Sequence, residues 1–217
     1  MAGKNRKPIS IQTLKRLPNY LHYLQTLNNK EVTNISATTI ANSLKLNEVQ
    51  VRKDLAAVSM ASGKPRTGFN INELIKGIES RLGYDSKDEA VIVGVGKLGQ
   101  ALFSYRGFQT YGLNIIAGFD SNPNLYNVTI EGKLILPMEK FVNLCQRMMI
   151  HIGIITVPAD QAQSVCDLML AGGIIAIWNF APMNLRVPNG IFVKNENMSA
   201  SLAMISQFLA EHFHESD

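Results

Sequence analysis

The sequence has few of the residues and patterns by which several protein classes are recognised. Its 217 residues include only two cysteines, Cys145 and Cys166, too few for the disulfide framework of a small secreted domain. No apolar run approaches the roughly 18 residues of a membrane-spanning helix, and no apolar signal region follows the basic residues at positions 4–7. We therefore expect a cytoplasmic protein with no membrane partner, whose two thiols belong to its core.

Charge is divided unevenly along the chain. Residues 1–80 carry a net charge of +7 and residues 81–217 carry −3, within a total of +4. A basic segment ahead of a mildly acidic one indicates two domains with different partners, and a polyanion would suit the first. A solvated basic face is the alternative, which charge alone does not exclude.

The pattern Gly94-x-Gly96-x-x-Gly99 lies between an apolar run and a predicted helix. Strand, glycine turn and helix in this order are typical of a dinucleotide-binding fingerprint. Gly94 permits the sharp turn, Gly96 leaves room for a pyrophosphate, and Gly99 lets the helix approach the strand. The start of the helix offers free backbone N–H groups to the phosphates, so Lys97 and Leu98 are included in the predicted cofactor site.

Strands and helices alternate around and after this turn, which predicts an α/β fold with a Rossmann-type doubly wound parallel sheet. The expected strands span 90–93, 114–120, 133–136, 150–157, 174–178 and 191–193, and the expected helices span 100–105, 137–148 and 159–171. Ligands of such sheets bind beyond the C-terminal ends of the strands. Thr156, Val157, Asn179 and Phe180 should therefore line one crevice with the glycines.

Asp120 ends the second strand, 21 residues after Gly99. An acidic residue near this spacing accepts a hydrogen bond from the adenosine ribose 2′-OH, and its charge repels a 2′-phosphate. The position therefore favours NAD(H) as the cofactor over NADP(H). The alternative is an ordinary turn residue, because Asp-Ser-Asn-Pro forms turns in any case.

Groups that would perform chemistry on a nicotinamide are scarce. A dehydrogenase usually positions His or Lys near the nicotinamide as an acid or base. The four histidines lie at positions 22, 151, 212 and 214. None of them is placed to act as an acid or base beside a nicotinamide, and their spacing matches neither a Ser-His-Asp triad nor a metal site. We therefore assign no catalytic residue and no metal site, and we expect the nucleotide to be sensed and not turned over.

The basic segment predicts a helix-turn-helix. A first helix is expected over 10–29, where Pro18 should kink the helix or displace its start. Two short helices come next, over 36–44 and 48–58, joined by a turn of about three residues. Two helices joined so tightly are typical of the DNA-binding helix-turn-helix motif, although a plain helical hairpin remains the alternative.

In a helix-turn-helix the second helix enters the major groove and presents its early residues to the bases. Gln50, Arg52 and Lys53 occupy these positions. Glutamine pairs with adenine, and Arg or Lys pairs with guanine. Ser36 and Thr38 of the first helix are expected to contact phosphates.

The segment 62–69 is a glycine- and proline-punctuated hairpin that carries Lys64 and Arg66. A hairpin directly after a recognition helix predicts the wing of a winged helix, with Arg66 long enough to enter a minor groove. A helix over 70–82 closes this domain, and the polar residues 85–88 form the expected linker.

The C-terminal segment 199–214 is amphipathic. It can pack on its own sheet, or it can cross to a second subunit, which we favour because helix-turn-helix proteins usually bind DNA as dimers. The predicted domains are a winged-helix domain over 1–84, a nucleotide-binding domain over 85–198 and a dimerisation helix over 199–217.

Together these motifs resemble the family of the redox-sensing transcriptional repressor Rex. The matching stretches are KRLPxY at 15–20, VRKDL at 51–55, GxGxLGxALxxYRGF at 94–108, VPAxxAQ at 157–163 and NFAP at 179–182. The resemblance implies a bacterial, cytoplasmic homodimer that is not an enzyme. It binds double-stranded operator DNA when NADH is scarce, releases it when NADH binds, and swaps its C-terminal helix between subunits.

The resemblance also implies roles for individual residues. The cations Arg52, Lys53, Lys64 and Arg66 become DNA contacts, and the glycine turn, Asp120 and the loop at Asn179 become the NAD(H) site. In the family, positions matching Arg16 and Tyr105 join a carboxylate near the start of the last helix in a switch. The matching position here is Asn197, with Glu196 as the nearest carboxylate, and Tyr105 is also expected near the cofactor.

Two other functions remain open at this point. One is an NAD-dependent oxidoreductase or CoA-binding Rossmann protein with an accessory basic domain. The other is a DNA-binding protein whose Rossmann fold no longer binds nucleotides.

Overall fold

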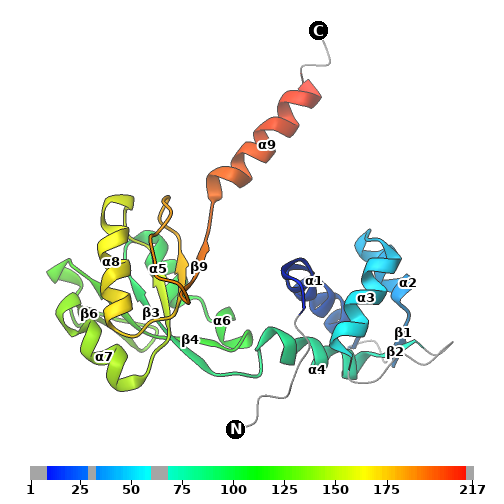
Figure 1. The fold of residues 1–217 in the computed structure, drawn as a ribbon, viewed down its shortest axis with the longest axis horizontal. Helices are drawn as coiled ribbons and strands as arrows, with labels where there is room; N and C mark the ends of the chain where they lie inside the picture. Colours follow the sequence, from blue (N-terminus) through cyan, green and yellow to red (C-terminus); the bar gives the residue numbers. More distant parts are fainter. Residues whose placement is uncertain (1–8, 29–32, 60–67, 214–217) are drawn as a thin grey trace. The chain divides into compact units, whose positions relative to one another are not determined.

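The computed structural model describes residues 9–28, 33–59 and 68–213, which belong to two compact units, residues 1–86 and 87–217. Each unit buries its own apolar side chains, and Figure 1 traces the chain from one to the other. In the described ranges, none of the helices combines the length and the apolar character that a membrane crossing requires.

The described part of the N-terminal unit consists mainly of helices. They are α1 (Ile11–Asn28), α2 (Ala37–Leu44), α3 (Glu48–Val58) and α4 (Ile71–Leu82). Their apolar faces meet in one core that includes Leu17 and Tyr20 of α1, Ile40 of α2, Leu55 of α3 and Ile78 of α4. The predicted helix-turn-helix arrangement, α2 and then α3 after a short turn, is confirmed.

Side-chain caps explain where these helices begin. Ser36, Asn47 and Asn70 each accept a hydrogen bond from the backbone N–H three residues further on, which satisfies a donor that the helix itself leaves unpaired. Ser10 does the same for the N–H of Thr13 at 3.1 Å. Helix α1 therefore starts directly after Ser10, and the proline inside it does not displace that start.

Two short strands, β1 (Asn34–Ile35) and β2 (Phe69–Asn70), pair in antiparallel fashion on either side of the helix-turn-helix. Phe69 lies opposite Ile35, which precedes α2. Of the predicted wing over 62–69, residues 62–67 lie outside the described residues, and these include Lys64 and Arg66.

The C-terminal unit is built on a seven-stranded sheet in the order β5-β6-β4-β3-β7-β8-β9. Its strands are β3 (Asp88–Val93), β4 (Leu113–Asp120), β5 (Thr129–Ile130), β6 (Lys133–Pro137), β7 (Ile152–Ile155), β8 (Ala176–Asn179) and β9 (Phe192–Asn195). Strand β5 is antiparallel to β6, and every other pairing is parallel. After β3 the chain adds β4 and β6 on one side of that strand and then crosses over to add β7, β8 and β9 on the other side. The predicted doubly wound sheet is therefore confirmed.

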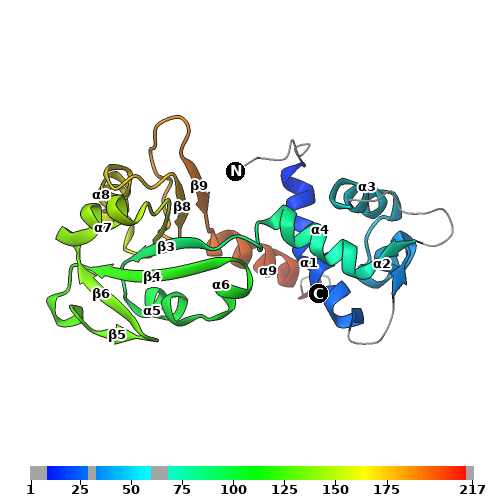
Figure 2. The ribbon, with the colours of Figure 1, turned by 90° about the horizontal axis from the view of Figure 1, so that it is seen from below.

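Helices cover both faces of this sheet. They are α5 (Lys97–Ser104) and α6 (Gly107–Thr110) on one face and α7 (Phe141–Met148) and α8 (Ala159–Ala171) on the other (Figure 2). Alternation along β3 produces the two layers: Ala90 and Ile92 pack with Phe103 of α5, whereas Val91 and Val93 pack with the side chains of α7 and α8.

The two cysteines lie in the second of these layers. Cys145 on α7 and Cys166 on α8 are both fully buried and unbridged. Burial raises the pKa of the Cys145 thiol to about 11. The expectation of core thiols is confirmed.

Several boundaries differ from the prediction. Helix α5 begins at Lys97 and not at residue 100, because Gly96 takes the N-cap position. Asp88, expected in a linker, opens β3 and lies opposite Leu113 of β4. Four short elements were not expected, because each is too short to show a hydrophobic period: β1, β5, α6 and the 3-10 turn η1 (Pro123–Leu125). The helix predicted over 137–148 begins with the 3-10 turn η2 (Met138–Lys140) and is α-helical only from Phe141.

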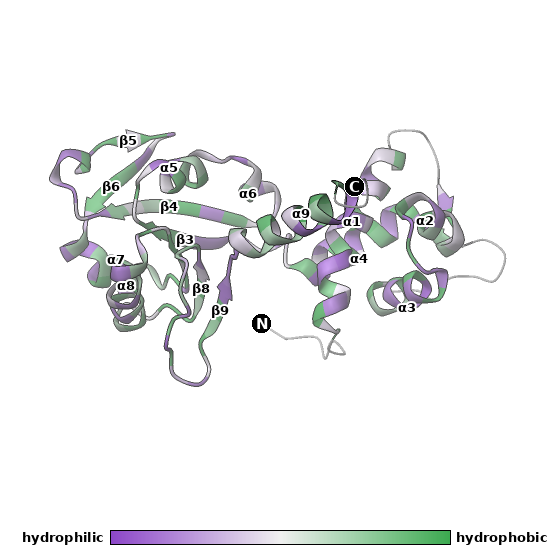
Figure 3. Cartoon of the chain, turned by 90° about the horizontal axis from the view of Figure 1, so that it is seen from above, coloured by the Kyte–Doolittle hydropathy of each residue, from purple (hydrophilic) through white to green (hydrophobic). Residues whose placement is uncertain are grey.

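The last helix, α9 (Met198–Phe213), contains no buried residue. Its large apolar side chains, from Met198 to Phe213, are 46% to 75% exposed, and Figure 3 shows apolar residues recurring along it. The alternative in which this helix packs on its own sheet is therefore wrong for this chain.

Candidate nucleotide crevice and DNA-binding surface

The C-terminal ends of the central strands meet at one edge of the sheet. Val93 lies opposite Phe119 on one side and Ile155 on the other, and Ile155 lies opposite Asn179. The residues directly after these strands, which include the glycine turn after β3, therefore share a single edge. This is the edge at which open α/β sheets bind their ligands.

Each glycine of the turn has a distinct environment. Gly94 has a φ of +91°, a conformation that side chains disfavour. A Cβ at Gly99 would lie 1.9 Å from the carbonyl oxygen of Gly94, so the start of α5 touches the turn directly. A Cβ at Gly96 would meet nothing within 4 Å. Gly96 thus leaves open space at the N-terminus of α5, as the binding of a pyrophosphate requires.

Two polar side chains brace the turn. Asp120 accepts a hydrogen bond from the backbone N–H of Val95 at 2.7 Å and one from Asn122 at 2.8 Å. The Thr156 hydroxyl donates to the carbonyl oxygens of Val93 and Gly94, at 3.1 and 2.5 Å. An ionised carboxylate has about four acceptor positions, so Asp120 retains capacity for a ribose hydroxyl while it also supports the turn.

A cavity of about 220 Å³ opens at this edge. Five of the predicted cofactor residues line it: Gly94, Gly96, Asp120, Thr156 and Val157. Sequence reasoning missed Ser121, Met138, Gln161 and Val165, and it gave Pro158 only a structural role. Ser121, Met138 and Pro158 closely follow strand ends, and this position is the signal that could have identified them, whereas Gln161 and Val165 lie further on, in α8.

The other predicted cofactor residues do not line this cavity. The Asn179 amide is fully buried and donates to the oxygens of Ala181, Met183 and Asn195, so it shapes the loop after β8. Phe180 packs against Trp178. Lys97 and Leu98 lie exposed in the first turn of α5, and Tyr105 is exposed at its end.

The helix-turn-helix presents several of the predicted DNA-contacting residues to solvent. The side chain of Arg52 is 66% exposed and forms an ion pair with Glu48, one turn earlier on α3. Lys53 and Thr38 are exposed. The Ser36 hydroxyl caps α2 and contacts Thr39, so its side chain already has partners.

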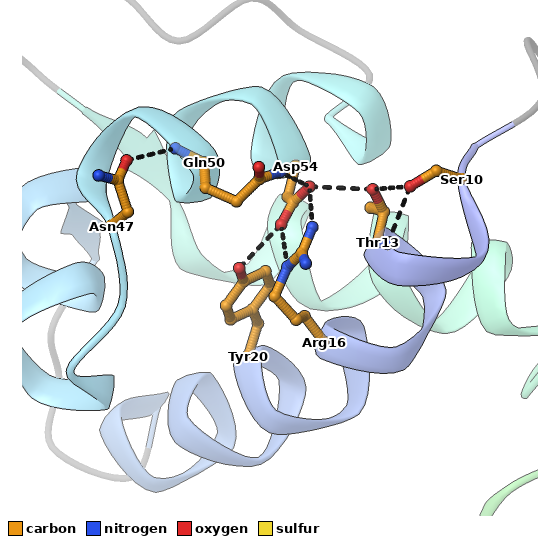
Figure 4. A network of polar contacts seen from close by, with 7 residues as sticks. All are labelled: Ser10, Thr13, Arg16, Tyr20, Asn47, Gln50 and Asp54. Carbon is orange, nitrogen blue, oxygen red and sulfur yellow. Dashed lines mark hydrogen bonds and ion pairs between the residues drawn. The ribbon is translucent and has the colours of Figure 1, made fainter.

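A buried carboxylate lies behind this surface. Asp54 of α3 is 2% exposed and joins α3 to α1 through the contacts drawn in Figure 4. Its Oδ2 accepts from Arg16 Nε at 2.8 Å and from Tyr20 Oη at 2.9 Å. Its Oδ1 accepts from Thr13, Arg16 Nη2 and Gln50 at 2.9 to 3.1 Å.

These contacts alter the acidity of the groups involved. Burial alone would raise the pKa of Asp54, but the hydrogen bonds that it accepts outweigh burial and hold that pKa below its usual value. The pKa of Tyr20 rises to about 12, first because of burial and then because its hydroxyl donates to this carboxylate. Asp54 is therefore ionised at neutral pH, a role that sequence reasoning did not assign to it.

The three predicted switch residues have partners within their own units. Arg16 is bound by Asp54, and Tyr105 packs edge-on against Phe108. Asn197 accepts a hydrogen bond from the backbone N–H of Ala200 at the start of α9. The alternative carboxylate, Glu196, accepts from the Trp178 indole at 2.8 Å and pairs with a lysine of β9.

Family comparisons agree with this division of the chain. Residues 8–56 match the family model described as "Putative DNA-binding protein N-terminus", and residues 85–183 match the CoA binding domain.

Proteins named redox-sensing transcriptional repressor Rex match nearly the whole chain. The relative from Bacteroides fragilis is 39% identical over 202 residues, which cover 93% of this chain and 91% of its own. The relative from Clostridium beijerinckii is 38% identical over 208 residues, covering 96% and 98%.

Solved structures of RSP, a Rex-family repressor, share the fold. The crystal structure of RSP with beta-NAD+ and operator DNA has a TM-score of 0.89 at 33% identity, covering 95% of this chain and 94% of its own. The crystal structure of RSP with beta-NADH has a TM-score of 0.84 at 33% identity, covering 94% and 95%.

Proposed function

The chain belongs to the family of the redox-sensing transcriptional repressor Rex, and we propose that it represses transcription in response to the NADH/NAD+ ratio. It binds operator DNA through the N-terminal unit and leaves the operator when NADH occupies the crevice beside Gly96. One observation carries this proposal: a helix-turn-helix and a dinucleotide crevice occur in one chain that matches RSP over 95% of its length. A repressor that acts on operator DNA would work in the bacterial cytoplasm, and this location is part of the proposal.

The crevice suits NAD(H) on its own geometry. The open space at Gly96 admits a pyrophosphate to the N-terminus of α5, and Asp120 offers its carboxylate to the adenosine ribose. Lys97 and Leu98 would contribute backbone N–H groups, and Thr156 and Val157 would form the opposite wall. The loop of Asn179 and Phe180 would close the nicotinamide end near Tyr105.

The nucleotide acts here as a signal. When bound, NADH can supply a hydride, but a transfer needs a positioned acid or base. Among the described residues that line the 220 Å³ cavity, Asp120 is the only titratable side chain, and it is engaged with the glycine turn; Tyr105, expected near the nicotinamide end, packs against Phe108. The residues of this chain therefore bind and orient the nucleotide, and the consequence of binding is a change in affinity for DNA.

In the DNA-bound state α3 would lie in the major groove. Gln50, Arg52 and Lys53 would face base edges and phosphates, with Ser36 and Thr38 near the backbone. Arg52 would exchange its exposed contact with Glu48 for a DNA contact, and Lys64 and Arg66 would serve as the wing.

A homodimer is part of this proposal. The unburied apolar side chains of α9 need a partner, and a second exposed apolar surface lies at the sheet edge, where Trp178 and Phe192 line a groove of about 380 Å³. A helix swapped between subunits would cover both surfaces and give the two-fold symmetry that paired half-sites require. Arg16, Tyr105 and Asn197 would link domains and subunits, without an ion pair to position 197.

The test is a titration of labelled operator DNA with the full-length protein, measured by fluorescence anisotropy. NADH must bind the DNA-incompetent state more tightly than the DNA-competent state, and the coupling is reciprocal. We expect NADH to release the DNA at far lower concentration than NAD+, and CoA to have no effect. Equal action of NADH and NAD+ would refute the proposal, and steady consumption of NADH with a small carbonyl compound would favour an oxidoreductase.

A further inference from the structure

The side-chain amide of Gln50 is held in a single orientation. Its Nε2 donates to Asp54 Oδ1 at 2.9 Å, one turn further along α3, and Figure 4 shows the side chain of Gln50 extending toward Asp54. Gln50 is half-buried and lies in the first turn of α3, where Asn47 accepts a hydrogen bond from its backbone N–H at 3.2 Å. Both its backbone and its amide are therefore fixed.

The chemistry of Asp54 explains this fixed orientation. An ionised carboxylate only accepts hydrogen bonds, and Asp54 is ionised because the Arg16 guanidinium binds both of its oxygens. Rotation of the Gln50 amide by 180° would place Oε1 against a buried negative charge and remove one of its donors. Leaving a buried charge short of a partner is costly, so Nε2 faces inward.

This arrangement leaves Oε1 of Gln50 as an open acceptor. Among the described residues, none donates a hydrogen bond to that oxygen. A glutamine without such a constraint can present either end of its amide and can read donors or acceptors. The Asp54 contact removes that ambiguity.

We propose that Asp54 is a positioning residue for base recognition, which holds Gln50 so that its Oε1 faces the base edge. The inference rests on the proposed role of α3 as the recognition helix. In the major groove, the amino groups of adenine and cytosine donate hydrogen bonds, whereas guanine and thymine offer only acceptors. Gln50 thus selects a base whose amino group lies in the major groove, adenine or cytosine. Adenine is preferred, because the second proton of Nε2 remains for its N7.

The experiment is a selection of binding sites from a random DNA pool by the full-length protein and three variants. The wild type should select adenine, or cytosine, at one position in each half-site. Gln50→Ala should lose the preference at that position alone. Asp54→Ala removes the acceptor, so the Gln50 amide can present either end, and the preference at that position should broaden to include guanine and thymine.

Tyr20→Phe is the matched control. It removes a donor to Oδ2 of Asp54 but leaves the Oδ1 contact with Gln50 in place. A merely structural role for Asp54 predicts that Tyr20→Phe and Asp54→Ala lower affinity alike without changing base preference. Such a result, or a folded Asp54→Ala protein with the wild-type preference, would overturn the proposal.

A second measurement does not require Asp54→Ala to fold. In the selected operator, the chosen adenine or cytosine is replaced by the analogue that lacks its amino group. The wild type should bind this DNA roughly 5- to 10-fold more weakly, and Gln50→Ala should bind both DNAs equally. Equal binding by the wild type would refute the acceptor role of Gln50. If Gln50→Ala kept the wild-type base preferences, Gln50 would not contact a base and the inference would fail. NADH would still release the DNA in that case, so the proposed function would stand.

Discussion

Two glycines of the same turn should respond in opposite ways to the addition of one methyl group. At Gly96 the backbone angles, φ −72° and ψ −165°, suit alanine, and the new Cβ would meet nothing within 4 Å. Gly96→Ala should therefore change the free energy of unfolding by less than about 0.5 kcal/mol. The methyl group would occupy the space that a pyrophosphate needs at the start of α5.

Because the pyrophosphate could no longer approach the backbone at Gly96 closely, NADH affinity should fall. A hydrogen bond to a charged group contributes about 1.5–3 kcal/mol, so one lost backbone contact with a phosphate lowers NADH affinity roughly 10- to 150-fold. At Gly99 the added Cβ would lie 1.9 Å from the Gly94 oxygen, and α5 must move by more than about 1 Å. Such overpacking costs about 1–3 kcal/mol, which lowers the melting temperature by about 2–12 °C.

Isothermal titration with NADH and thermal unfolding without nucleotide measure the two effects separately. Gly96→Ala should unfold as the wild type does and bind NADH weakly, whereas Gly99→Ala should unfold at a lower temperature. Wild-type NADH affinity in Gly96→Ala would show that the nucleotide does not approach the turn at this point. A stability loss in Gly96→Ala equal to that in Gly99→Ala would refute the distinction between open space and close packing.

The other predictions concern the ribose, the DNA contacts, the buried carboxylate and the last helix. Asp120→Asn removes the charge that repels a 2′-phosphate, so binding assays should show NADH affinity falling and NADPH competing better than it does against the wild type; an unchanged NADH/NADPH ratio would contradict the assignment. Lys53→Ala should weaken operator binding and reduce the slope of log affinity against log salt concentration by the equivalent of about one phosphate contact. Lys76→Ala on α4 should change neither quantity in the same anisotropy titrations. The pKa of Asp54 is lowered in the folded state, so its stabilising effect is present above the unfolded pKa of about 3.9 and is lost as pH falls through the folded value. Denaturant unfolding at decreasing pH should therefore destabilise the wild type more than Asp54→Asn, and parallel pH profiles would argue against this role. Deletion of α9 should give a monomer in sedimentation experiments with much weaker operator binding, and a dimer that persists would exclude α9 as the interface.

Local signals in the sequence predicted much of the fold. Ser36, Asn47 and Gly83 mark helix ends by their own chemistry, because a side-chain oxygen caps a neighbouring N–H and glycine adopts the left-handed conformation at little cost. The buried strands were found from their apolar runs. The antiparallel strand β5 and helix α6 were missed, since elements of two and four residues depend on neighbours and not on a period of their own.

The residues of the candidate site also fall into those that local sequence signals predicted and those that depend on distant contacts. The glycine turn and Asp120 could be read from spacing, because strand, turn and helix place them without long-range contacts. The polar environment of Asp54 could not, since its donors Thr13, Arg16 and Tyr20 come from a helix more than thirty residues earlier. The side chain of Asn179 was assigned to the cofactor, but tertiary structure directs it into the loop after β8.

The sequence by itself determined the two-part organisation, the helix-turn-helix, the parallel sheet and the nucleotide fingerprint. Each of these is encoded by caps, glycines and apolar periods that act over a few residues. Only the tertiary structure decided which side chains are free to bind and which are already engaged, because hydrogen-bond partners come from distant elements. Tertiary contacts thus distinguish Gly96, which is open to a ligand, from Gly99 of the same motif, which packs against the turn. They also pair Arg16 with Asp54 within the DNA-binding unit.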